Sequence, residues 1–393
     1  MTVAKKMQTF AEKSSWIRKM FEEGARMKAE YGADNVFDFS LGNPDVPPPS
    51  RFSEILRELA AEDRAGMHAY MPNGGYPYVR ETLAGQLSKE QEVNLTQGEI
   101  LMTCGAAGAL NVVMKSLLDP GDEVIILSPF FVEYNFYIDN HGGVARVVKT
   151  DDEFNLDIAA IEEAISTKTK AVLINSPNNP TGQIYSAESL ADLGRLLEAA
   201  GEKFCTTIYL ISDEPYRKLV FDGFTVPSIM AAYENSIVVS SYSKDLSLPG
   251  ERIGYLAVHP EITEKAELLD AMTLANRILG FVNAPALMQR VVERLQGISV
   301  DTSIYARRLE IFCRVLESAG IEFTRPKGAF YLFPKSPLDD VEFCSLLQQQ
   351  KILAVPGRGF GAPGYFRLAF CVDDQVIENS AAGFRAAMAA AGA

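Results

Sequence analysis

The middle of the chain alternates short apolar runs with segments of helical periodicity. Seven runs rich in β-branched and aliphatic residues occur at 99–105, 123–129, 144–150, 169–177, 206–215, 236–241 and 252–258. Between them, residues 109–118, 155–165 and 186–201 carry apolar side chains at helical spacing, and Ser186 is a suitable N-cap for the third segment. Strands and helices in alternation predict an α/β fold built on a mostly parallel sheet.

The pattern changes after residue 261. Helical segments follow at 261–272, 284–297 and 302–320, and then a short mixture of strands and helices runs to the C-terminus. The first 32 residues mix both charge signs with apolar residues at helical spacing, which predicts an amphipathic helix and not a secretory signal.

A chain of 393 residues exceeds what one hydrophobic core usually serves. We therefore expect three segments. Residues 1–46 would be an N-terminal helix and a proline-rich connector belonging to a small domain, 47–290 a large α/β domain, and 291–393 the rest of the small α+β domain.

Small and polar residues follow the predicted strands. The strand ends read "CGAAG", "SPFF", "NSPNNPTG", "SDEPY" and "SSYSK", and in a parallel sheet such ends meet at one edge. Asp213 ends an apolar strand, where a carboxylate is costly unless a cation or several donors face it. Lys244 follows another such strand, and it is either a solvated loop residue or a lysine with a chemical role. The sequence therefore predicts a functional site at this edge.

Composition and charge narrow the choice of partners. The net charge of -14 argues against a nucleic acid or an anionic membrane surface, and no apolar run is long enough to cross a bilayer. Five scattered cysteines and three isolated histidines predict no metal site and a cytoplasmic protein with reduced thiols. The turn at 104–108 would offer backbone amides to a phosphate, but it lacks the glycine spacing of dinucleotide-binding loops.

Five motifs in consistent order resemble the signature of the class I/II pyridoxal-phosphate aminotransferases, the aspartate aminotransferase superfamily. They are Asn179-Pro180-Thr181-Gly182, Asp213, Tyr216, Ser241-x-Ser243-Lys244 and Arg252. The resemblance runs from about residue 31 to the C-terminus. It implies the fold of that superfamily, in which a large domain with a mostly parallel seven-stranded sheet carries the cofactor and a smaller α+β domain closes the site.

The resemblance implies roles for the catalytic residues. Lys244 would bind pyridoxal phosphate covalently and, once released, would move a proton between the substrate α-carbon and the cofactor. Asp213 would keep the pyridine nitrogen protonated, so that the ring accepts electrons. Asn179 and Tyr216 would hydrogen-bond the ring oxygen.

The resemblance also implies which residues hold the rest of the cofactor. Phe131 would stack on the ring; the alternative is a core phenylalanine. Tyr70 would reach the phosphate bound by a partner subunit, which makes a homodimer with shared sites the expected assembly. The phosphate itself would be held by Gly105, Ala106, Ala107, Ser241, Ser243 and Arg252.

Substrate recognition follows the same resemblance. Arg367 lies in an apolar strand with no acid nearby in sequence and would bind the substrate α-carboxylate, with Asn179 beside it. The backbone of Gly42 would close over the substrate. Arg277 would either bind a second carboxylate or be an ordinary surface arginine.

The resulting hypothesis is an aminotransferase with a ping-pong mechanism. It would move the amino group of an L-amino acid, with aspartate as the first candidate, to a 2-oxo acid, with 2-oxoglutarate as the first candidate. Aromatic, alanine or broad specificity stays open, and so does a pyridoxal-phosphate-dependent carbon–sulfur β-lyase, because that class shares nearly every motif.

Overall fold

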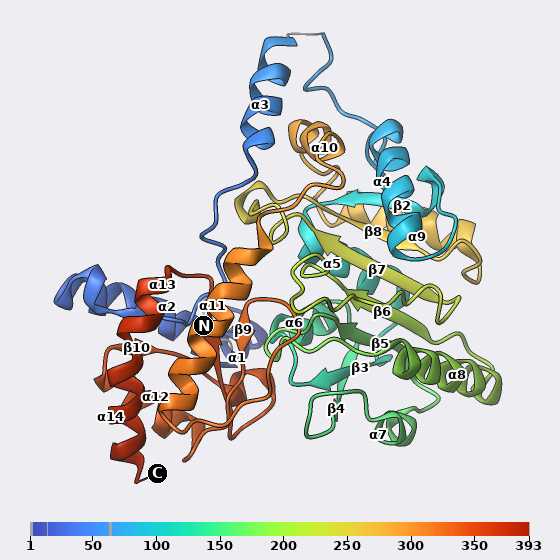
Figure 1. The fold of residues 1–393 in the computed structure, drawn as a ribbon. Coiled ribbons are helices and arrows are strands. Elements are labelled where there is room, and N and C mark those ends of the chain that lie inside the picture. The colour runs from blue at the N-terminus through green and yellow to red at the C-terminus, as the bar shows by residue number, and fades with distance from the viewer. Residues whose placement is uncertain (1–2, 14, 63–64, 393) are drawn as a thin grey trace.

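A seven-stranded sheet forms the centre of the fold (Figure 1). The computed structural model describes residues 3–13, 15–62 and 65–392. Along the sheet the strands follow the order β2-β8-β7-β6-β5-β3-β4. Their bounds are β2 (Ile100–Thr103), β3 (Glu123–Ser128), β4 (Val144–Lys149), β5 (Thr169–Asn175), β6 (Tyr209–Asp213), β7 (Ser236–Ser241) and β8 (Gly254–Val258). Each of the apolar runs predicted as strands is therefore confirmed.

The sheet is mostly parallel, as predicted. The pairs β7–β6, β6–β5, β5–β3 and β3–β4 are parallel, whereas β8 runs antiparallel to both of its neighbours, β2 and β7. Strands β2, β3, β5, β6 and β7 consequently end at one edge. Strand β8 begins at that edge, so Arg252, two residues before its start, joins the strand ends.

Helices cover both faces of the sheet. Those before the C-terminal part are α3 (Ser50–Glu62), α4 (Pro77–Glu90), α5 (Gly105–Leu117), α6 (Glu133–Asn140), α7 (Ile158–Ala164), α8 (Ala187–Phe204), α9 (Lys265–Ile278) and α10 (Ala286–Glu293). Side chains alternate between the two faces. In β3, Val124 and Ile126 pack with α5, α6 and α9, while Ile125 and Leu127 pack with α3, α4, α7, α8 and α10. The predicted N-cap is confirmed, because Ser186 accepts a hydrogen bond from the Ser189 amide.

The C-terminal part of the chain forms a second group of elements with its own buried cluster. These elements are α11 (Thr302–Ser318), β9 (Tyr331–Leu332), α12 (Asp340–Gln349), β10 (Ile352–Leu353), β11 (Val355–Pro356), β12 (Phe366–Ala369), α13 (Asp374–Asn379) and α14 (Ala381–Ala391). Strands β11, β12 and β9 form a small antiparallel sheet. Its strand β12 carries Arg367.

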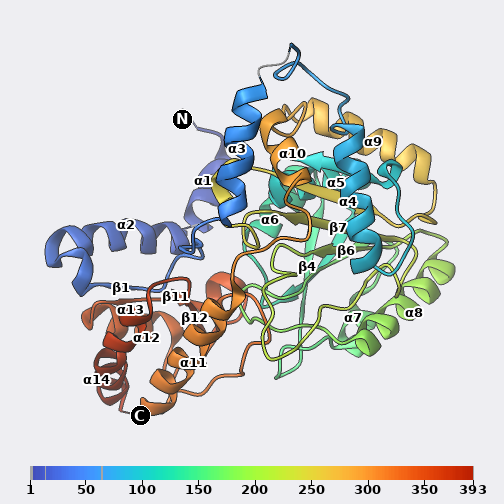
Figure 2. The same ribbon diagram turned by 45° about the horizontal axis from the view of Figure 1, so that its top comes forward.

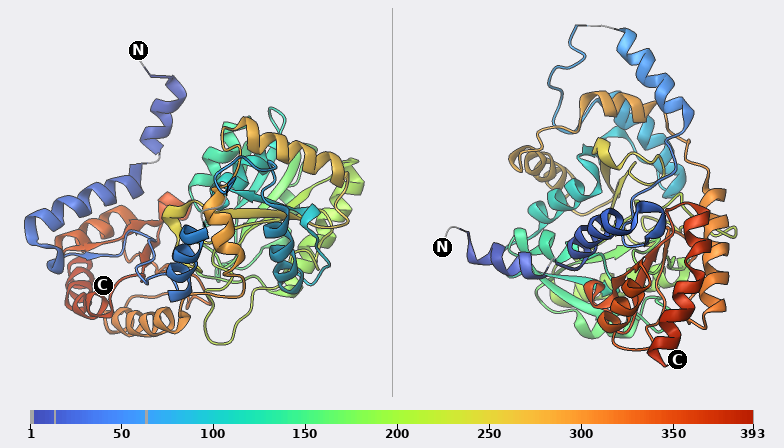
Figure 3. Two further views of the ribbon diagram at one scale, coloured as in Figure 1. Left: turned by 90° about the horizontal axis from the view of Figure 1, so that it is seen from above. Right: turned by 90° about the vertical axis from the view of Figure 1, so that its left-hand side faces the viewer.

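The N-terminal segment joins this second group. It comprises α1 (Lys5–Lys13), α2 (Ser15–Tyr31) and β1 (Phe37–Asp38), which pairs in parallel with β10. Two helices thus occupy the region predicted as one, and residues 1, 2 and 14 of that prediction lie outside the described part of the chain. Helix α2 lies beside the C-terminal elements, coloured red (Figure 2). A view from above shows the same arrangement (Figure 3). Domain boundaries at residues 46 and 290 stay predictions.

Short 3-10 turns complete the described elements: η1 (Ala33–Asn35), η2 (Gln97–Glu99), η3 (Pro249–Glu251) and η4 (Gly357–Phe360). Within the described ranges, none of the helices combines the length and the apolar character that crossing a bilayer requires.

Candidate active site

The shared edge of the sheet borders a pocket of about 300 Å³ that also touches the second group of elements. Most of the residues that the sequence singled out line this one pocket. They are Gly42, Ala106, Ala107, Phe131, Asn179, Asp213, Tyr216, Ser241, Ser243, Lys244, Arg252 and Arg367. Segments more than 300 residues apart in the chain are therefore brought together here.

Lys244 lies on the loop after β7 and borders the pocket. Its Nζ donates a hydrogen bond to the carbonyl oxygen of Gly42 at 2.8 Å. Burial of the amine lowers the pKa of Lys244 to about 8, and the nearby guanidinium groups of Arg367 and Arg252 act in the same direction. A substantial fraction of this lysine is therefore neutral near pH 8, as a nucleophile or proton carrier requires.

Asp213, the last residue of β6, is 6% exposed. Its Oδ2 accepts a hydrogen bond from the Tyr134 hydroxyl at 2.7 Å, while its Oδ1 is buried and has no hydrogen-bond partner among the described residues. Burial raises the pKa of Asp213 to about 7. A buried carboxylate with a free oxygen is suited to an N–H group of a ligand, particularly a cationic one.

Asn175, at the end of β5, connects two of the predicted residues. Its Oδ1 accepts from the backbone amide of Asn179 at 2.7 Å, and its Nδ2 donates to the carbonyl oxygen of Asp213 at 2.7 Å. Asn175 therefore holds the turn after β5 against the end of β6.

Arg367 is 3% exposed and forms no ion pair with a described carboxylate. Its Nη1 donates to Asn179 Oδ1 at 3.1 Å, and its Nη2 donates to the carbonyl oxygen of Ser40 at 2.7 Å. Its Nε is buried and has no partner among the described residues. The guanidinium carbon lies 4.7 Å from the ring centroid of Tyr331 and 4.8 Å from that of Phe360. This cation is held rigidly and lacks an anion, which fits a carboxylate ligand.

Tyr331 also contacts the other side of the pocket. Its hydroxyl lies 3.0 Å from the hydroxyl of Tyr216. A Cβ atom on Gly42 would lie only 1.9 Å from the Tyr331 Oη, so position 42 has no room for a side chain. The glycine predicted to close over a substrate is thus required by the tyrosine that faces it.

The far end of the pocket has the features of an anion site. Helix α5 begins here at Gly105, with φ of 75°, and its N-cap residue Cys104 makes no side-chain capping bond. A Cβ atom on Gly105 would lie 2.9 Å from Arg252 Nη2, so the glycine allows the guanidinium to approach the helix N-terminus. Backbone amides, the helix dipole and a guanidinium together favour a phosphate.

The profile of the family described as "Aminotransferase class I and II" matches residues 34–384. The chain belongs to the class I and II aminotransferases. The aspartate aminotransferase of Thermotoga maritima is 34% identical over 365 residues, which cover 90% of this chain and 92% of that protein. The aspartate/prephenate aminotransferase of Thermus thermophilus is 32% identical, with 87% and 88% covered.

Solved structures agree with this assignment to the aminotransferases. An amino transferase from Eubacterium rectale superposes with a TM-score of 0.97 at 36% identity, and all of both chains is covered. The Thermus thermophilus aspartate aminotransferase with maleate gives a TM-score of 0.84 at 28% identity over 95% of this chain and 96% of that one. The predicted family and fold are therefore confirmed.

Three predicted residues of this aminotransferase do not line the pocket. Tyr70 is 91% exposed, and Arg277 is exposed near the end of α9. Gly105 lies beside the pocket, next to Arg252. Phe131 lines it and makes an edge contact with Tyr134, with 5.6 Å between ring centroids. The roles of all these residues stay predictions.

The sequence did not single out several residues that shape the pocket. Tyr134 follows Phe131 by three positions, so the strand end "SPFFVEY" contained the signal. Tyr331 and Phe360 come from the small sheet and from η4, where no strand-end rule applies. Ser40 and Asn175 act through a backbone carbonyl and a bridging amide, which residue type alone does not reveal.

Proposed function

We propose that this aminotransferase depends on pyridoxal phosphate and moves the amino group of an L-amino acid to a 2-oxo acid. One observation carries the proposal. A single pocket combines a lysine of lowered pKa, a buried carboxylate with a free oxygen, and a buried arginine without an acid. These three groups are what an amine-transferring cofactor and its amino acid substrate need.

The pocket residues fit this cofactor at each end. The free Oδ1 of Asp213 suits the protonated ring nitrogen. Phe131 offers an aromatic face, and the N-terminus of α5 with Arg252, Ser241 and the neighbouring amides suits the phosphate. Pyridoxal phosphate supplies a ring that accepts the electron pair released when the substrate Cα–H bond breaks.

The residues of the chain do the remaining work. Lys244 holds the cofactor and moves the proton at the substrate α-carbon, which its lowered pKa allows. Arg367 binds the α-carboxylate and orients the Cα–H bond. The hydroxyls of Tyr216 and Tyr331 and the amide of Asn179 supply hydrogen bonds beside the reacting amine.

Aspartate and 2-oxoglutarate are the first substrates to test, because relatives above 30% identity carry the name aspartate aminotransferase. Among the described residues, the basic ones that line the pocket are Lys244, Arg252 and Arg367. In this proposal a further cation for a side-chain carboxylate would come from a partner subunit. This requirement supports a homodimer with shared sites, in which the exposed Tyr70 and Arg277 would be interface residues. A cytoplasmic location, inferred from the scattered cysteines, is part of the same proposal.

A donor panel tests the proposal directly. Purified protein loaded with pyridoxal phosphate is mixed with aspartate, glutamate, alanine and phenylalanine, and conversion of the bound chromophore to its pyridoxamine form is followed. We expect conversion with at least one donor and recovery when a 2-oxo acid is added. An S-alkyl-cysteine is tested in parallel, and release of pyruvate, ammonia and a thiol from it, with no amino transfer to a 2-oxo acid, would instead indicate a carbon–sulfur β-lyase. A protein that binds no pyridoxal phosphate would contradict the proposal.

A further inference from the structure

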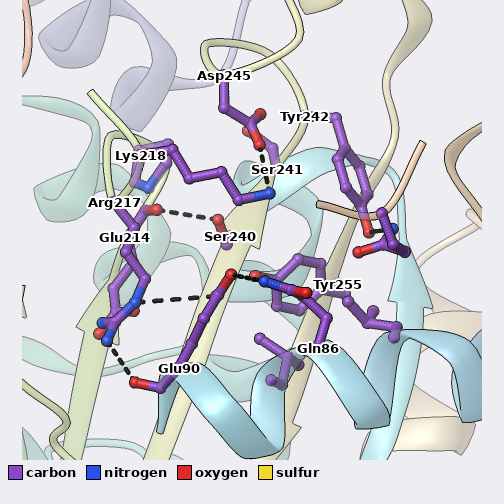
Figure 4. A pocket seen from close by; sticks show the side chains of 14 residues that line it. Gln86, Glu90, Glu214, Arg217, Lys218, Ser240, Ser241, Tyr242, Asp245 and Tyr255 are labelled. Carbon is purple, nitrogen blue, oxygen red and sulfur yellow. Dashed lines mark hydrogen bonds and ion pairs between the residues drawn. The ribbon is translucent and has the colours of Figure 1, made fainter. Parts of the chain in front are cut away.

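A second, smaller cavity lies behind the edge of the sheet that borders the active-site pocket (Figure 4). Its volume is about 20 Å³, enough for one water molecule but too small for a substrate. Pro215 and Ser241 line both this rear cavity and the active-site pocket. The rear cavity therefore adjoins the site through a wall one residue thick.

Charged side chains line the rear cavity: Glu90, Glu214, Arg217, Lys218 and Asp245. They form two sets, both visible in Figure 4. Arg217 pairs with Glu214 at 2.8 Å and lies 3.8 Å from Glu90. Lys218 Nζ lies 3.2 Å from Asp245 Oδ2. The second set, Lys218 and Asp245, lies on the loops after β6 and β7, which also carry Tyr216 and Lys244.

Neighbouring residues on these loops point to opposite sides. Lys244 and Tyr216 line the active-site pocket, whereas Asp245 and Lys218 line the rear cavity. Asp245 is the next residue after Lys244, and Lys218 is the second residue after Tyr216. The ion pair thus joins the two loops directly behind the groups that would contact cofactor and substrate.

Because the Lys218–Asp245 ion pair is largely buried, each charge depends on the other for its stabilisation. The side chain of Asp245 is 9% exposed and that of Lys218 is 25% exposed. Burial raises the pKa of Asp245, and the ammonium group of Lys218 opposes that shift. Asp245 Oδ1 has no hydrogen-bond partner among the described residues, and Lys218 is the main group that stabilises the carboxylate, with a smaller contribution from the backbone amide of Leu246. Removal of one partner leaves the other charge poorly compensated.

The backbone of Asp245 is fixed as well. Its carbonyl oxygen accepts a hydrogen bond from the amide of Val300 at 2.8 Å. Val300 precedes α11 and packs in the buried cluster of the second group of elements. The residue after the lysine is therefore anchored to a second loop by its side chain and to the start of the C-terminal elements by its backbone.

We propose that Lys218 and Asp245 are a positioning pair that fixes the amine of Lys244 relative to Tyr216. The pair touches neither substrate nor cofactor and acts through the two loops that it connects. This inference rests on the proposed function, because it assigns the pair a role in cofactor attachment and proton transfer by Lys244.

The test uses Lys218→Met and Asp245→Asn, with Lys335→Met as a matched control. Lys335 forms an exposed ion pair with Glu322 at 3.5 Å, far more accessible than the rear cavity. Three quantities are measured for each chain: the pH midpoint of the bound cofactor's absorbance, the Kd of pyridoxal phosphate for the apo chain, and kcat and KM for the best donor. The apo melting temperature is recorded alongside.

For both rear-cavity variants we expect the pH midpoint of the cofactor's absorbance to shift by about 0.5 pH unit or more, because the Lys244 amine would no longer be held in place. One pH unit corresponds to a tenfold change in the protonation equilibrium. We expect kcat to fall by about tenfold, because displacement of a catalytic group by ~1 Å can cost ~10²-fold, with the donor KM little changed. The control should match the unaltered chain.

A lower melting temperature with an unchanged midpoint, Kd and kcat would mean that the pair is merely structural, and it would overturn the proposal. If Lys218→Met fails to fold, the isosteric Asp245→Asn still decides the question. An unaltered chain that shows no cofactor chromophore would contradict the proposed function instead, so the two failures are distinguishable.

Discussion

Two buried arginines of this chain have opposite surroundings. Arg308, in α11, is 6% exposed, and its Nη1 and Nη2 each donate to the Asp45 carboxylate at 2.7 Å. Its Nε donates to Asp374 at 3.2 Å. Arg367, in β12, is 3% exposed and reaches only an amide oxygen and a backbone carbonyl.

The difference separates structural charges from functional ones. A buried guanidinium is costly unless a counter-charge is near, and Arg308 finds both of its acids within the chain. Arg367 finds none among the described residues, which is what a site for an external anion requires. The same contrast holds for carboxylates, because the buried Asp340 pairs with Arg358 at 2.7 Å, whereas Asp213 keeps a free oxygen. Among the described residues, the buried charges Asp213 and Arg367 have no counter-charge, and both lie at the pocket.

We expect the largest effect from Lys244→Ala. This substitution removes another cation of the pocket, one that pairs with no acid among the described residues. We expect turnover to fall by ~10⁴-fold or more, because both cofactor attachment and proton transfer are lost. The apo melting temperature should not drop, because burial of the Lys244 amine is unfavourable to folding and the substitution removes that cost. Steady-state kinetics and calorimetry measure the two effects. Activity within tenfold of the unaltered chain would refute the assignment.

Arg367→Leu should have the next largest effect. We expect kcat/KM for the amino donor to fall by about 10²–10³-fold, which is the size seen when one partner of a buried charge pair is truncated. Stability should be unchanged or improved, because the unaltered arginine has no acid to lose. Donor titrations and thermal unfolding test both parts. A large loss of stability would place Arg367 in the same class as Arg308.

Arg308→Leu should show the reverse profile. Its loss leaves the carboxylate of Asp45 without its cation, whereas Asp374 keeps its ion pair with Arg307 at 2.7 Å. Both carboxylates are about one-third exposed. We expect the free energy of unfolding to fall by about 1–3 kcal/mol and the donor KM to change little. Denaturant unfolding of the apo chain provides the measurement. A selective rise in donor KM would break the distinction between the two arginines.

The smallest effect concerns pH. The pKa of Asp213 is raised from 3.8 to about 7 in the folded chain, so folding favours its protonated form. Its contribution to stability is complete at low pH and is lost as the pH rises through about 7. Asp213→Asn should therefore reduce the difference in apo melting temperature between pH 5 and pH 8 by roughly 2 °C. An identical pH dependence in both chains would contradict the raised pKa.

The strands and most of the pocket could be predicted because the rule that links them is local. Apolar runs gave the seven strands, and the polar residues after them had to meet at one edge. Lys244 and Asp213 were found in this way. Strand β8 runs antiparallel to β7, so its beginning, and not its end, lies at this edge. The prediction for Arg252 still holds, because Arg252 precedes β8.

Other contributions depend on packing between distant segments and could not be predicted. Tyr134 reaches Asp213 from α6, and Tyr331 reaches Arg367 from β9, so tertiary packing sets their directions. Ser40 acts through a carbonyl that any residue possesses. The proposed roles of Tyr70 and Arg277 would require a second subunit, because both residues are exposed and lie outside the pocket of the single chain.

The contact between Gly42 and Tyr331 has a consequence for redesign. The Tyr331 Oη fills the space in which a side chain at position 42 would begin, and the same ring packs on Arg367. A library that varies position 42 alone should favour glycine, because any other residue would have to displace the Tyr331 ring across the pocket. Enlarging that position requires a smaller residue at 331, which would loosen the arginine. The two positions must therefore be varied together, and any gain in substrate range would be exchanged against a weaker hold on the carboxylate.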